Sequence, residues 1–127
     1  ELAITKVISG KIEDAVAQVT EAIKPAGFGI LTRINFDKKI KEKIGENIKP
    51  CVILGACNPG LAFKAYQQSP DAALLIPCNI VLTESSPGHV QIEAIKPTKM
   101  LGILPEVNLR NEIMVIEANL KQCLDSL

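Results

Sequence analysis

The chain has 127 residues, of which 47% are hydrophobic and only 3% aromatic, and its 14 basic and 14 acidic residues leave a formal net charge of zero. This length suits one domain, residues 1–127, with an aliphatic core. A neutral chain lacks the basic surface that neutralises phosphates, and one poor in aromatic rings lacks platforms for base stacking, so we expect no nucleic-acid binding.

Membrane association and export are not expected either. No apolar run reaches the roughly 18 residues that cross a bilayer, no signal-peptide pattern is present, and the balanced charge gives no attraction to anionic lipids. Four cysteines without close pairing predict reduced thiols in a cytoplasmic protein. The chain begins at Glu1 and not at Met, so a preceding segment could have been removed.

The first two predicted elements are a strand and a helix. Residues 2–9 alternate weakly between apolar and polar, as in a strand. Ser9 is a candidate N-cap for a helix that ends at residues 25–27. The apolar face of this helix contains Ile12, Ala15, Val16, Val19 and Ile23.

A second strand is predicted at residues 28–34. Asn35 or Asp37 would cap the short helix that follows, and Gly45 would end it. Four lysines in residues 37–43 are typical of a solvated helix face and need no partner.

Two longer apolar runs predict covered strands. Residues 51–56 are apolar at every position and end where Asn58 and Pro59 open a helix that continues to about residue 68. Residues 73–84 form the next run, and Pro77 predicts a bulge or bend within it because proline cannot donate to a sheet ladder.

Turn residues at 85–89 and an alternating strand at 90–95 then predict a hairpin. A helical turn begins at Pro97, and a long helix runs from about Asn108 to the C-terminus with apolar residues on one stripe. The order βαβαβα, then ββ, then α predicts an α+β fold in which helices cover a mixed or antiparallel sheet.

The main candidate site is the strand-to-helix corner, which we define as residues 55–60. Cys57 would lie just before the helix that Asn58 caps, where free N–H groups and the helix dipole can lower the pKa of a thiol. Such a cysteine could be a nucleophile or could carry sulfur. The alternative is a small buried residue that packs a tight corner.

Cys78 belongs to the next apolar run, so its sulfur could lie close to that of Cys57 if the two strands are neighbours. Cys51 lies too far along the same strand to pair with Cys57, and Cys123 falls on the inner stripe of the last helix, so both are expected to be core residues. The single histidine, His89, is placed in the hairpin turn, and no Cys-x-x-Cys is present, so we expect no metal site.

Other catalytic arrangements have little support. A Cys–His–Asn set of Cys57, His89 and Asn79 would need His89 to fold back over the sheet. The corner is no P-loop, because it lacks the Gly-Lys-Ser/Thr ending. No acid–base pair stands out, so whether the protein is an enzyme stays open, and no cofactor is expected.

The segments ILGACNPGLAFKAY, ALLIPCNIVL and AIKPTKML, together with FGILTRINFDKKIKEKIG, closely resemble the family catalogued as domain of unknown function 302 (DUF302). The resemblance runs from about Val7 to Leu127. It implies an α+β fold, a homodimer and no established activity, with some members associated with sulfur metabolism. Many distant relatives have Gly where this chain has Cys57, so the fold needs the Asn-Pro cap and not the thiol.

Two hypotheses follow. In the first, the protein handles sulfur or redox chemistry, or binds a small anionic or sulfur-containing ligand, with Cys57 and Cys78 as reactive thiols. The ligand-binding residues would be Gly55, Asn58, Pro59, Gly60 and Asn79. In the second, the protein is a non-catalytic homodimeric interaction module whose cysteines only pack.

Overall fold

The computed structural model describes residues 1–127 and contains a five-stranded sheet with five α-helices. The strands are β1 (Ala3–Ser9), β2 (Gly29–Asn35), β3 (Cys51–Cys57), β4 (Cys78–Ser86) and β5 (His89–Ile95). The helices are α1 (Ile12–Ala22), α2 (Phe36–Ile44), α3 (Pro59–Gln68), α4 (Pro97–Leu101) and α5 (Arg110–Asp125), with short 3₁₀ turns at η1 (Lys24–Ala26) and η2 (Pro70–Leu74). No helix is long and apolar enough to cross a membrane.

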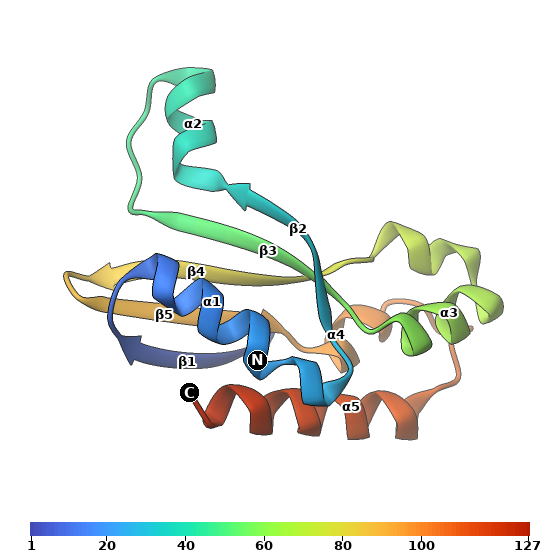
Figure 1. The fold of residues 1–127 in the computed structure, drawn as a ribbon. Helices are drawn as coiled ribbons and strands as arrows, with labels where there is room; N and C mark the ends of the chain where they lie inside the picture. The colour runs from blue at the N-terminus through green and yellow to red at the C-terminus, as the bar shows by residue number, and fades with distance from the viewer.

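The sheet has the strand order β1-β5-β4-β3-β2, and every neighbouring pair is antiparallel. This confirms the predicted α+β class and order of elements. Although β1 and β2 follow one another in sequence, they lie at opposite edges of the sheet, and α1 carries the chain between them (Figure 1).

The core lies between one face of the sheet and the helices α1 and α5. Val19 of α1 and Leu120 and Leu124 of α5 are almost fully buried. They belong to one cluster with the inward residues of the central strands, among them Leu54, Ile80, Leu82, Val90 and Ile92. Because side chains alternate along a strand, positions such as Thr5, Val7 and Asn79 point to the other face and are exposed.

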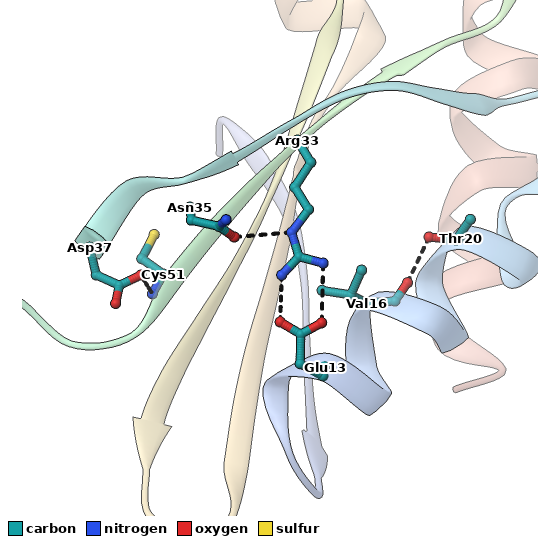
Figure 2. A network of polar contacts seen from close by, with 7 residues as sticks. All are labelled: Glu13, Val16, Thr20, Arg33, Asn35, Asp37 and Cys51. Carbon is teal, nitrogen blue, oxygen red and sulfur yellow. Dashed lines mark hydrogen bonds and ion pairs between the residues drawn. The ribbon is translucent and has the colours of Figure 1, made fainter. Parts of the chain in front are cut away.

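Helix starts differ from the sequence-based expectation at two places. The residue before α1 is Lys11, and Ser9 instead ends β1. Asn35 precedes α2 without a capping side-chain bond, while the Asp37 carboxylate accepts a hydrogen bond of 3.1 Å from the backbone N–H of Cys51 (Figure 2). Gly45 ends α2 at φ 74°, as predicted.

The strand predicted at 73–84 was placed too early. Residues Pro70–Leu74 form a 3₁₀ turn, the Ile76–Pro77 peptide is cis, and β4 begins at Cys78. Pro77 thus stands just outside the strand, where its missing N–H costs no ladder bond.

An ion pair fastens the edge strand β2 to α1. The Arg33 guanidinium donates to both carboxylate oxygens of Glu13, at 3.1 and 2.5 Å, and its Nε donates to Asn35 at 3.0 Å (Figure 2). The two parallel N–H···O bonds define the orientation of both groups. They hold β2 against the body of the protein at the point where the chain leaves it.

From Leu31, two residues before Arg33, the chain projects from the body. We call residues 31–49 the arm; it contains most of β2, the helix α2 and part of the loop to β3. In Figure 1, α2 stands well away from the other helices, and none of its residues is buried. The arm exposes five large apolar side chains: Leu31, Ile34, Phe36, Ile44 and Ile48.

Candidate functional site

Asn58 organises the strand-to-helix corner. β3 ends at Cys57, and the Asn58 side-chain oxygen accepts a hydrogen bond of 3.1 Å from the N–H of Leu61. Pro59 is the first residue of α3. The predicted Asn-Pro helix start is therefore confirmed.

The same side chain also joins the corner to a distant part of the chain. The Asn58 amide nitrogen donates to the carbonyl oxygen of Ala26 at 3.2 Å. Next to it, Gly27 has φ +84°, and a Cβ at that position would lie 2.8 Å from the amide nitrogen. Glycine is thus required twice over, for its backbone conformation and for this close approach. The sequence signalled the cap but not this second contact.

Gly55 also permits a close approach. A Cβ on this residue would lie 2.1 Å from the Thr32 hydroxyl oxygen and 2.7 Å from Cγ of Pro77. The missing side chain lets the rigid Pro77 ring pack directly on β3. Because Pro77 immediately precedes Cys78, this contact helps to place the Cys78 thiol.

Cys57 and Cys78 lie on neighbouring strands but are not paired with each other. The register of β3 and β4 pairs Cys78 with Ala56, so Cys57 is one residue out of register and the alternation along the strand points its side chain to the opposite face of the sheet. Both cysteines line one small apolar cavity of about 20 Å³, a space of roughly the size of one water molecule. Cys78 is 8% exposed and Cys57 is half-buried, and both are free thiols.

Burial is the main cause of the shifted pKa values of both thiols. It raises the pKa of Cys57, and it raises the pKa of Cys78 to about 11, with a further contribution from the charge that Cys57 would carry as a thiolate. The expectation of a lowered pKa at Cys57 is therefore wrong.

The helix N-terminus offers little that would oppose this effect of burial. Pro59 has no N–H, the N–H of Leu61 is bonded to the Asn58 side chain, and the N–H of Ala62 is bonded to the Asn58 carbonyl. The start of α3 therefore has few free donors that could stabilise a thiolate.

Met100 is a third sulfur at this site. It lies on α4, lines the same cavity and has its Sδ 3.6 Å from Sγ of Cys78. The sequence analysis did not single it out, since a lone methionine beside Leu101 is typical of a core position. No local pattern in the sequence connects α4 to the corner.

The other predicted ligand-binding residues do not gather around this cavity. Asn79 is exposed on the other face of the sheet, while Pro59 and Gly60 lie exposed in the first turn of α3. Of the five residues proposed as ligand-binding, only Asn58 lines the cavity.

His89 cannot complete a catalytic set with Cys57. It begins β5 and pairs with Ser86, at the opposite end of β4 from Cys78. Cys78 and Ser86 are eight positions apart along the strand, a distance of roughly 26 Å. The Cys–His–Asn arrangement is therefore absent, and no three His, Cys, Asp or Glu side chains gather around a common point.

The remaining cysteines lie elsewhere. Cys51 is buried at the start of β3, where the Thr83 hydroxyl lies 3.9 Å from its sulfur. Cys123 packs against the core from α5 but is only half-buried, less than its predicted core position implied.

A second and larger hollow is found between β1, α4 and α5. It has a volume of about 1290 Å³ and contains the side chains of three acidic residues, Glu1, Glu93 and Glu117, and of three basic residues, Lys96, Arg110 and Lys121. The Glu117 carboxylate is already bonded to the N–H and hydroxyl of Thr98. With its charges balanced, this groove shows no preference for an anion or a cation.

Comparisons with known proteins agree with this fold. A profile of the family described as "Domain of unknown function DUF302" matches residues 4–127. The crystal structure of an uncharacterised conserved DUF302 protein from Bacillus stearothermophilus is 28% identical, with a TM-score of 0.85 over 98% of this chain and 96% of that one. No functionally curated protein matches the chain. With its whole fold and nearly its whole sequence matched, the chain belongs to the DUF302 family.

Proposed function

We propose that the protein is a small thiol-dependent redox protein in which Cys57 and Cys78 form one reversible dithiol–disulfide site. The observation that carries the proposal is that both cysteine residues line the same small cavity. Directly paired Cα atoms in antiparallel strands lie about 4.5–5.5 Å apart. The Cα atom of Cys57, one residue beyond the partner of Cys78, therefore lies about 6 Å from the Cα atom of Cys78. This separation is within the range of about 4.4–6.8 Å that disulfides span, and closing the bond also requires the end of β3 to turn the Cys57 side chain toward Cys78.

The two thiols would have different roles. Cys57 is the more exposed, so its thiolate attacks one sulfur of a small-molecule disulfide such as oxidised glutathione and releases one glutathione thiol. Cys78 then loses its proton and attacks the Cys57 sulfur of the mixed disulfide, releasing the second glutathione. Overall, two protein thiols are oxidised and one glutathione disulfide is reduced to two thiols.

The other residues of the corner support the site without contacting a ligand. Asn58 fixes the start of α3 behind Cys57, and Gly55 allows Pro77 to pack behind Cys78. Because both thiols have raised pKa values, the thiolate fraction at neutral pH is small and oxidation is expected to be slow.

The test is a titration of the reduced native protein with oxidised glutathione, read by intact mass and by peptide mapping. We expect a loss of two hydrogens per chain and a single cross-link between Cys57 and Cys78. Cys78→Ser should stop at a stable mixed disulfide on Cys57, whereas Cys51→Ser, the matched control at the other end of β3, should behave like the wild type. A protein that stays fully reduced, or forms only intermolecular disulfides, would refute the proposal.

A second candidate function, a homodimeric interaction module, is favoured by the arm. Leu31 and Ile44 are 63% and 66% exposed there. The arm contains five lysines, Arg33 and three acidic residues, which leaves eight basic and eleven acidic residues in the rest of the chain. The slightly basic segment of one copy would thus meet a slightly acidic body in another, and its apolar side chains would be buried.

Sedimentation equilibrium tests this dimer. The double variant Ile44→Glu and Ile48→Glu should shift a dimer to monomers, because it places charges in an apolar contact. Leu74→Glu is the control, since Leu74 is 83% exposed but lies on η2, outside the arm. A wild-type protein that is monomeric at tens of micromolar would exclude the module.

A further inference from the structure

The strand β1 has a free edge. It lies at one end of the sheet and pairs only with β5. The N–H of Lys96 donates to the carbonyl of Leu2 at 2.9 Å, and the N–H of Gly10 donates to the carbonyl of Gly88 at 2.8 Å; both bonds continue the register of this pair. In an antiparallel ladder, hydrogen-bonded pairs alternate with pairs whose backbone groups point away from the partner. The even-numbered residues of β1 therefore bond to β5, and the odd-numbered residues direct their N–H and C=O groups to the free edge.

This edge lacks the features that usually block strand pairing. The odd-numbered residues carry no charge and are small or β-branched: Ala3, Thr5, Val7 and Ser9. Proteins commonly protect a free edge with a bulge, a proline or a charge. β1 keeps an unbroken register over its seven residues, and its only charged side chain, Lys6, is bonded to the Asp125 carbonyl. The opposite edge strand, β2, contains a bulge between Ile30 and Thr32. β1 is therefore the edge that can accept a further strand.

The groove of about 1290 Å³ runs along this edge. The consecutive residues 1–5 line it, and their side chains point alternately to the two faces of the sheet. The helix α5 lies beside β1 (Figure 1) and lines the groove with Ile113, Met114 and Ala118. Met114 is 50% exposed and Leu2 is 66% exposed. A strand added to β1 would cover these apolar side chains.

Two charged side chains of the groove have no partner. The other four contact a neighbouring side chain, in the pairs Glu1 with Lys96, Glu117 with Thr98, and Lys121 with Asp125. Glu93 and Arg110 make no ion pair and no side-chain hydrogen bond. An occupant that complements this groove therefore carries one basic and one acidic group, each placed to meet its counterpart.

The positions of these two charges define the direction of an added strand. Glu93 is opposite Thr5. The last turn of α5 lies beside Lys6, so Arg110 at the start of α5 lies toward the N-terminal end of β1 (Figure 1). A strand antiparallel to β1 has its C-terminal end there. A basic side chain opposite Thr5 would then reach Glu93, and an acidic side chain just past the end of β1 would reach Arg110.

We propose that β1 docks an extended segment of a partner protein, which joins the sheet as a further strand antiparallel to β1. The segment has apolar side chains at alternate positions that pack on α5, a basic residue opposite Thr5 and an acidic residue near its C-terminal end. Its backbone bonds to the outward N–H and C=O groups of β1, and its side chains provide the specificity. A second copy of β1 complements the groove less well, because its own outward residues are uncharged and leave Glu93 without a partner.

The probe is the fluorescein-labelled peptide amide Val-Thr-Lys-Val-Thr-Ile-Ser-Glu. With its lysine opposite Thr5, its second valine and its isoleucine face α5, and its glutamate lies past the end of β1. Fluorescence anisotropy with the full chain should show saturable binding with a Kd below about 1 mM. A peptide in which the lysine and the glutamate are exchanged should bind at least about tenfold more weakly. N-methylation of the lysine and second threonine amides, which face β1, should abolish binding, whereas N-methylation of the second valine amide, which faces away, should not.

Thr5→Pro is the decisive protein variant. It removes an N–H that faces the free edge and keeps every bond between β1 and β5, as prolines on edge strands do. With folding checked by circular dichroism, it should weaken peptide binding at least about tenfold. Thr5→Val keeps the N–H and should bind like the wild type. Arg110→Gln should weaken binding, whereas Lys99→Gln, an exposed lysine of α4 outside the groove, should not.

Several results would overturn the proposal. These are no saturation below about 1 mM, equal binding of the charge-exchanged peptide, and unchanged affinity in both Thr5→Pro and Arg110→Gln. Sedimentation equilibrium adds a further check. A wild-type dimer that Thr5→Pro converts to monomers would show that the edge binds a second copy of this chain and not a partner protein.

Discussion

The two side-chain hydrogen bonds of Asn58 can be separated by mutation. Replacing it with alanine removes the acceptor for the Leu61 N–H and the donor to the Ala26 carbonyl. An N-cap is worth about 0.5–2 kcal/mol and a further hydrogen bond about 0.5–1.5 kcal/mol, so Asn58→Ala should lower the free energy of unfolding by about 1–3.5 kcal/mol. Asn58→Ser keeps a capping acceptor and loses the donor to Ala26, so its loss of stability should be clearly smaller.

Urea unfolding at pH 7, followed by circular dichroism, measures all three proteins. Asn79→Ala is the matched control, because Asn79 is exposed and bonds to no other side chain in the structure; its effect should stay within about 0.5 kcal/mol. If Asn58→Ala costs less than about 0.5 kcal/mol, the cap does not stabilise the corner. If Asn58→Ser lowers the free energy of unfolding as much as Asn58→Ala, the two contacts are not separable and the reasoning fails.

Three further predictions concern packing, thiol reactivity and acid stability. Gly55→Ala should lower the free energy of unfolding by about 1–3 kcal/mol through overpacking. Gly29→Ala in the adjacent strand, with nothing within 4 Å of the new Cβ, should leave it nearly unchanged, and equal urea midpoints for the two variants would contradict this. Alkylation of Cys78 in the native protein should accelerate up to about pH 11, and a plateau near pH 8.5 would show that burial does not raise its pKa. The hydrogen bond from Arg33 lowers the pKa of the Glu13 carboxyl, so this pair stabilises the fold fully above the unfolded-state pKa and less as pH falls through the folded-state pKa. The difference in the free energy of unfolding between wild type and Glu13→Gln should therefore shrink in acid. A difference that grows in acid would contradict this prediction.

The sequence was most informative where a local rule decides the structure. The uninterrupted apolar run at 51–56 predicted a covered strand, and Asn58 with Pro59 predicted a helix start, because periodicity and capping act over a few residues. Residues 73–77 were assigned to a strand for the same apolar character. There, the chain leaves the ladder before Pro77, and the apolar side chains pack around a turn instead.

The candidate site was only half visible in the sequence. The expectation that the strands of Cys57 and Cys78 could be neighbours is confirmed by the pairing of β3 with β4, which places Cys78 opposite Ala56. The raised pKa values did not follow, because burial depends on how α3 and α4 close over the corner. Met100 could not be placed at all, since it follows Cys78 by 22 residues and reaches it through the packing of α4.

The pairing of β1 with β5 has a consequence for synthesis of the chain. Ser9 pairs with His89, so the first strand emerges from the ribosome about 80 residues before its partner, which at 5–20 residues per second is a delay of about 4–16 s. Lys6 of β1 also donates to the carbonyl of Asp125, near the end of the chain. The first strand to be made is thus among the last to be secured, and a nascent chain halted before residue 89 would present β1 as a free edge open to chaperones or to other strands.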